Sequence, residues 1–94
     1  MTTPGAALLA EAAETIQQRE GAHGDKGKTF RMIAAMWSAY LGAEVSPADV
    51  AQMMVLLKVA RARCGDRAHR DHYVDQAGYV ACTADLLPES QTTG

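Results

Sequence analysis

The chain has few aromatic residues, few cysteines and little net charge. One Trp, one Phe and three Tyr stand among 94 residues, so most of a core must come from Ala, Leu, Met and Val, which pack well in helices. The formal net charge of −2 provides no broad basic field, and we therefore do not expect binding to duplex nucleic acid. Cys64 and Cys82 match no zinc or redox spacing, and we expect free thiols.

Long apolar runs and strand-like alternation are also missing. The first residues, MTTPGAALLAEAA, have no basic segment before an apolar run, so we expect neither a signal peptide nor a membrane span. No segment alternates apolar and polar residues convincingly enough to predict a strand. The length fits one domain, and we expect residues 1–94 to form a single helical unit.

Four segments do carry apolar residues at helical spacing. They span residues 5–20, 29–42, 47–63 and 71–87, and a short tail, 88–94, begins at Pro88. The sequence therefore predicts an all-α fold, which we expect to be a four-helix antiparallel bundle.

The third segment has both the clearest start and the most apolar surface. Ser46 suits an N-cap, Pro47 suits the first helical position, and Asp49 places negative charge at the positive end of the helix dipole. The residues that follow are apolar on almost every side, which is typical of a helix surrounded by its neighbours. We place this helix at the centre of the fold and expect a homodimer or higher homo-oligomer to complete the core.

The stretch GAHGDKGK, residues 21–28, interrupts the helical pattern with three glycines. We expect a loop here, because glycine lets the backbone approach a ligand closely. His23 and Asp25 would place polar side chains on that loop. The spacing does not match a Walker A phosphate loop, and a plain turn capped by Asp25 is the alternative.

Charged residues recur at helical intervals in the last two helices. Lys58 and Arg61 are three apart and share a face. Asp71 and Asp75 are one turn apart, and paired carboxylates suit Mg²⁺, which prefers oxygen ligands. The alternative is that Asp71 begins the fourth helix while Asp75 pairs with Lys58 or Arg61.

Two further pairs allow a functional and a structural interpretation. Glu11 and Glu14 are three apart and could present two carboxylates to one metal ion, but on spacing alone a solvated helix face is the better explanation. Trp37 and Tyr40 are also three apart, and we interpret them as core aromatics rather than as a shelf for stacking bases.

Four stretches, taken in order and spacing, resemble a family of small phage and prophage proteins of unknown function. They are HGD at residues 23–25, FRMIAAMWSAYLG, DVAQMMVLLKVAR at residues 49–61, and DHYVDQAGYVA at residues 71–81. The resemblance runs from about Glu14 to Leu87. It implies a place in the cytoplasm of a bacterial host.

The K..R and D...D..GY arrangement is also similar to phage nucleotide-modification-associated domains and, more distantly, to MazG-like all-α nucleoside triphosphate pyrophosphohydrolases. Those enzymes hold Mg²⁺ with an ExxE…ExxD pattern and direct a water at the α-phosphate. The resemblance implies that Asp71 and Asp75 are catalytic metal ligands and that Lys58 and Arg61 face phosphate oxygens. The single ExxE pair lies before the HGD stretch, which departs from the pattern of those enzymes.

Three hypotheses follow. The first is a Mg²⁺-dependent (d)NTP pyrophosphohydrolase-like protein. The second is a non-catalytic phage accessory protein that binds a nucleotide, another phosphate-bearing small molecule or a host protein. In the third, the charged residues form a structural network between the third and fourth helices. Under the first two, the expected ligand-binding residues are His23, Asp25, Lys58, Arg61 and Tyr79.

Overall fold

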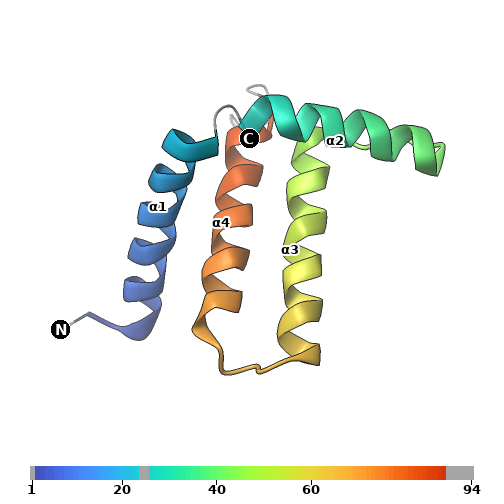
Figure 1. Ribbon diagram of the computed structural model, residues 1–94. Coiled ribbons are helices and arrows are strands. Elements are labelled where there is room, and N and C mark those ends of the chain that lie inside the picture. Colours follow the sequence, from blue (N-terminus) through green and yellow to red (C-terminus); the bar gives the residue numbers. More distant parts are fainter. Residues whose placement is uncertain (1, 24–25, 89–94) are drawn as a thin grey trace.

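The computed structural model describes residues 2–23 and 26–88, which form four α-helices and contain no strand (Figure 1). The helices are α1 (Pro4–His23), α2 (Lys26–Leu41), α3 (Pro47–Cys64) and α4 (Arg70–Leu86). The expectation of an all-α class with four helices is confirmed for this part of the chain. Neither Cys64 nor Cys82 forms a disulfide, as expected.

The start of α3 forms as its sequence predicts. The hydroxyl of Ser46 accepts a hydrogen bond from the Asp49 N–H at 3.0 Å, and the Asp49 carboxylate accepts one from the Ser46 N–H at 2.9 Å. Pro47 occupies the first turn, where its missing N–H leaves no bond unmade. This reciprocal capping box fixes where α3 begins.

The connection between α1 and α2 is much shorter than the expected loop over residues 21–28. α1 continues to His23, and α2 begins at Lys26, so Gly21 and Gly27 are helical. A helical glycine costs only about 1 kcal/mol relative to alanine, which the flanking helical residues can offset. The loop expectation was wrong for those residues, while Gly24 and Asp25 lie outside the described part of the chain.

Three helices lie side by side, with α4 between α1 and α3, and α2 runs across their ends and extends past α3 (Figure 1). α3 and α4 are antiparallel, whereas α1 and α4 run in the same direction. The expected antiparallel four-helix bundle is therefore not confirmed. The Cα radius of gyration is 14.6 Å, compared with about 12 Å for a compact domain of this length, because the end of α2 projects.

The core is built from small side chains. Among the described residues, the buried hydrophobic side chains are Ala12, Ala34, Ala48, Val50, Ala51, Ala62 and Val74. Alanine and valine allow helix axes to approach closely but bury little apolar area per residue. Larger apolar side chains remain at the surface, so the core is modest for a chain of this length.

α3 is not surrounded, contrary to the sequence-based expectation. α4 holds the middle position, and α3 leaves Met53, Leu56 and Leu57 exposed. An apolar pattern indicates that burial stabilises a helix face, but it does not show which part of the molecule buries that face. Tyr40, expected in the core, is 89% exposed because it lies on the projecting part of α2. Trp37 is half-buried.

No helix in the described part of the chain is both long and apolar enough to cross a membrane.

Candidate ligand pocket

A pocket of about 240 Å³ lies between α1, the first turns of α2, and α4. Its apolar surface includes Ala12 and Ile16 of α1 and Val74 of α4, where those two helices pack together. Gly78 leaves part of the volume open, because a Cβ added there would meet no atom within 4 Å. The pocket therefore depends on a missing side chain on α4.

Two aromatic rings form one wall of the pocket. Phe30 of α2 and Tyr79 of α4 are stacked, with ring centroids 6.5 Å apart and planes inclined by 22°. The pair joins α2 to α4 and presents flat apolar surface to the pocket. Tyr79, expected as a ligand-binding residue, thus lines the pocket.

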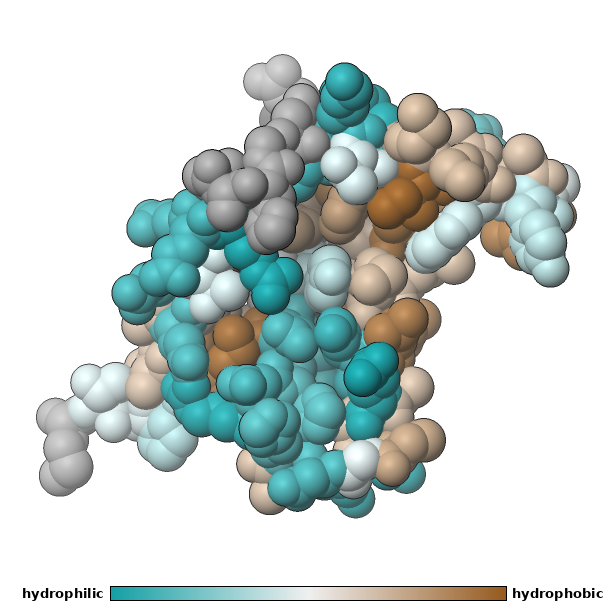
Figure 2. Space-filling view, viewed as in Figure 1, coloured by the Kyte–Doolittle hydropathy of each residue, from teal (hydrophilic) through white to brown (hydrophobic). Residues whose placement is uncertain are grey.

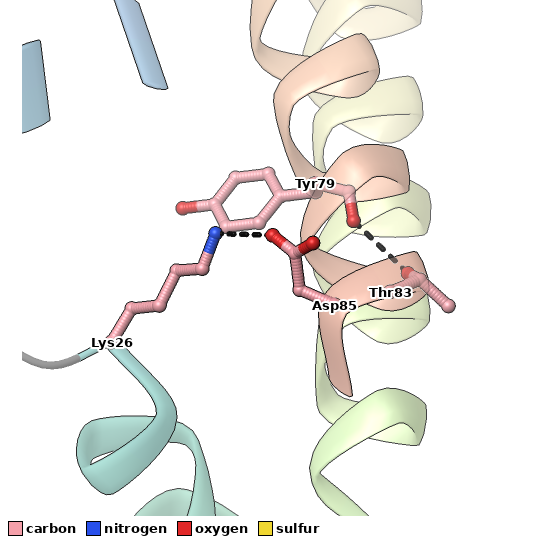
Figure 3. A network of polar contacts seen from close by, with 4 residues as sticks. All are labelled: Lys26, Tyr79, Thr83 and Asp85. Atoms are coloured by element: carbon pink, nitrogen blue, oxygen red, sulfur yellow. Dashed lines mark hydrogen bonds and ion pairs between the residues drawn. The ribbon is translucent and has the colours of Figure 1, made fainter. Parts of the chain in front are cut away.

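Two cationic side chains also line the pocket, Arg19 from α1 and Lys26 from α2. The Lys26 ammonium reaches across to α4 and lies 2.7 Å from the Asp85 carboxylate (Figure 3). In the same network, the Thr83 hydroxyl donates a 3.0 Å hydrogen bond to the Tyr79 carbonyl. Arg19 makes no ion pair with another described residue. Its guanidinium is available to an anion at the pocket.

Asp75 connects the pocket to α3. Its carboxylate lies 3.2 Å from the Lys58 ammonium, and both side chains are about one-quarter to one-third exposed, at 32% and 22%. This is the interhelical ion pair that the structural alternative for Asp75 predicts. Lys58 contacts Asp75 but does not itself line the pocket.

Asp71 lies apart from the pocket, in the first turn of α4. Its carboxylate is largely exposed and lies 3.4 Å from Nε2 of His69. Glu11 of the ExxE pair forms an ion pair with Arg70, and Glu14 is exposed. No three His, Cys, Asp or Glu side chains in the described ranges come together to hold a metal ion. A Mg²⁺ site at Asp71 and Asp75 stays a prediction, in which these two carboxylates would be the protein ligands.

The remaining expected site residues are Arg61, His23 and Asp25. Arg61 is exposed near the far end of α3 and does not line the pocket. His23 is the last residue of α1. Asp25 lies outside the described residues.

Sequence reasoning missed several lining residues, among them Arg19, Lys26, Thr29 and Cys82. No local motif marks them, because they come from three helices and meet only when these pack. Phe30 lies in the segment 29–42 that the sequence predicts to be helical, but its stacking on Tyr79 depends on how α2 crosses α4.

The model of a family described as a domain of unknown function (DUF6378) matches residues 7–87, and the chain belongs to this family. The Gene 55 protein of Mycobacterium phage D29 is 39% identical over 83 residues, which cover 87% of this chain and 54% of that protein. The Gene 55 protein of Mycobacterium phage L5 is 41% identical over 87 residues, covering 89% and 55%. No solved structure matches the chain.

These comparisons confirm the expected similarity to phage proteins of unknown function. They show no similarity to MazG-like enzymes. The chain spans about half the length of the two relatives.

Proposed function

We propose that the pocket between α1, α2 and α4 binds a nucleotide, or a similar small molecule with a flat ring and a phosphate, without turning it over. The observation that carries this proposal is the combination, in one pocket, of the Phe30–Tyr79 wall with the cations Arg19 and Lys26. The aromatic wall can contact the flat ring of such a ligand, and the cations can bind its phosphate.

The size of the pocket limits what part of the ligand it encloses. Its volume of about 240 Å³ lies just below the range of about 300–1,000 Å³ typical of small-molecule sites. A base or a sugar with one phosphate fits, and further phosphates would extend into solvent beyond the rim. Affinity should therefore depend little on the number of phosphates.

The charges favour an anion at Arg19. Lys26 is neutralised in part by Asp85, and Asp75 is paired with Lys58. Arg19 lacks a carboxylate partner among the described residues, and a guanidinium can donate two parallel hydrogen bonds to a phosphate.

Mg²⁺-dependent pyrophosphohydrolysis is the second candidate, and the Asp75 carboxylate at the pocket is the observation that favours it. Binding alone fits better, because Asp71 lies outside the pocket and Asp75 already has a cationic partner. If the protein is a hydrolase, Asp75→Asn should abolish metal-dependent turnover while the helix content is unchanged.

The test is a thermal-shift and calorimetric screen with each NTP, dNTP and nucleoside monophosphate, with and without Mg²⁺ or Mn²⁺, and with pyrophosphate release read in parallel. We expect a ligand-dependent rise in melting temperature without product. Arg19→Ala should weaken binding by roughly 10-fold or more, the worth of a charge-assisted hydrogen bond. The matched control is Arg67→Ala, an exposed arginine outside the pocket.

Pyrophosphate release that requires metal and is lost in Asp75→Asn would establish the hydrolase instead. Absence of a shift from every nucleotide, or equal weakening by Arg19→Ala and Arg67→Ala, would overturn the proposed pocket function.

A further inference from the structure

α3 presents an apolar stripe to solvent on the side away from α4. The stripe consists of Met53, Leu56, Leu57 and Ala60, all exposed, at positions i, i+3, i+4 and i+7. This spacing places the four side chains along one helix face, the arrangement through which two helices pack. Ala51 and Ala62, on the opposite face of α3, are buried. One side of α3 is thus packed and the other is uncovered.

The projecting part of α2 adds to this surface. Ala34 is buried, whereas Leu41, two turns further along the same helix face, is 55% exposed because α2 extends past α3 there (Figure 1). Met36 and Tyr40 are also exposed, on the opposite face of α2. Figure 2 shows hydrophobic colouring over α2 and down the outer side of α3, while mostly hydrophilic colouring covers the α1 and α4 side.

We infer that a second copy of this chain covers the α3 stripe, with the two α3 helices antiparallel about a two-fold axis between Leu56 and Leu57. In this register, Leu56 of each copy faces Leu57 of the other, and Met53 faces Ala60. A two-fold interface must be self-complementary, and the stripe meets this requirement because the leucines pack on each other at the centre and each methionine lies opposite an alanine that leaves room for it.

The charges at the two ends of α3 select the antiparallel direction. Asp49 lies in the first turn of α3 and Arg63 in the last, about four turns apart, and both are exposed beside the stripe. Antiparallel pairing places Asp49 of each copy beside Arg63 of the other, so the interface would contain this charge pair twice. It also sets the negative end of each helix dipole beside the positive end of its neighbour.

The exposed apolar side chains that face the second copy are Leu41, Met53, Leu56 and Leu57, each 37% to 67% exposed. They contribute on the order of 400 Å² together, about half of the roughly 800 Å² that each partner contributes to a standard interface. Charged side chains beside the stripe, Asp49 and Arg63 among them, supply the polar rim. Because α2 crosses at the start of α3, its projecting part would lie over the end of the second copy's α3.

The experiment compares two leucines that are almost equally exposed. Leu56, at 67%, lies at the centre of the stripe, whereas Leu9, at 63%, lies on α1 with α4 between it and α3. Sedimentation equilibrium should show the wild-type chain and Leu9→Lys as dimers. Leu56→Lys should raise the dimer dissociation constant by about 100-fold or more, since two ammonium groups would enter the apolar centre. Circular dichroism should show equal helix content in all three.

Charge reversal tests the direction of pairing independently of the apolar centre. Arg63→Asp should weaken the dimer, because carboxylates would face Asp49 of the second copy, and the double variant Arg63→Asp with Asp49→Arg should restore it. A wild-type chain that stays monomeric at all concentrations, or equal weakening by Leu9→Lys and Leu56→Lys, would overturn the inference and leave the stripe to a different protein. Failure of the double variant to recover would overturn the antiparallel arrangement.

Discussion

At the scale of single residues, the half-buried pair of Lys58 and Asp75 decides how α3 and α4 respond to substitution. Each of the single changes Lys58→Met and Asp75→Leu leaves an unpaired charge that is partly removed from water. We expect each to cost about 1–2 kcal/mol of unfolding free energy, between the cost for exposed and for buried pairs. The double variant should cost less than the sum, because no unpaired charge remains.

Urea unfolding of the four proteins in a double-mutant cycle measures this coupling. Strictly additive effects of the two changes would show that the ion pair contributes nothing to stability. The same cycle separates a structural role of Asp75 from a role in ligand turnover, since turnover would be lost in both Asp75→Leu variants whatever their stability.

At the scale of helices, two glycines should respond to alanine with opposite signs. Gly42 follows α2 with φ of +69°, a conformation that L side chains rarely adopt, so Gly42→Ala should destabilise the fold by about 1 kcal/mol. Gly78 lies inside α4 with nothing within 4 Å of an added Cβ, so Gly78→Ala should stabilise it by up to about 1 kcal/mol.

Gly78→Ala carries a second consequence, because Gly78 lines the pocket. The added methyl group should reduce the pocket volume and weaken nucleotide binding even though the fold becomes more stable. Thermal unfolding measures the first effect and calorimetry the second. Unchanged affinity in a stabilised Gly78→Ala protein would place the ligand elsewhere.

The capping box of α3 supplies another prediction at this scale. Ser46→Ala removes the acceptor for the Asp49 N–H and should cost about 1 kcal/mol. For a domain of this size, that cost lowers the melting temperature by roughly 4–8 °C. Gln17→Ala, on an exposed face of α1, is the control and should leave the melting temperature unchanged.

The start of α3 was the most predictable boundary in the molecule, because its signals are local. Ser46, Pro47 and Asp49 identified the start of α3, and the structure shows the capping box that they form. Gly21 and Gly27 misled, since a single glycine disfavours a helix only weakly and both lie within helices that the neighbouring residues extend. The spacing of the charged residues also predicted, as one alternative, an ion pair between Lys58 and Asp75, and the structure contains this pair.

Relations between helices could not be predicted in the same way. Nothing near Tyr40 in sequence shows that α2 runs past α3 and leaves this ring exposed. The pocket could not be predicted from the sequence either, because Arg19, Lys26 and Tyr79 come from three different helices. Helical periodicity indicates which face of a helix is apolar, but several arrangements of four helices satisfy the same set of faces.

At the scale of the whole molecule, α2 should be less protected than α4. It packs chiefly on α3, whereas α4 packs on both α1 and α3. Local stability follows the density of packed contacts, so amides in the second half of α2 should exchange with solvent faster than those of α4. Hydrogen-exchange mass spectrometry at low protein concentration measures this. Slower exchange in α4 than in α2 is the expected order, and the reverse would contradict the arrangement of the helices.

The position of α4 between α1 and α3 also sets the order in which the chain can fold as it is synthesised. α1 packs sideways against α4, yet the ribosome makes α2 and α3 before α4 appears. At about 5–20 residues per second, α1 stays without its neighbour for several seconds. The antiparallel pair α3–α4 needs only a short turn to close and should form first, and α1 then adds to a surface already in place.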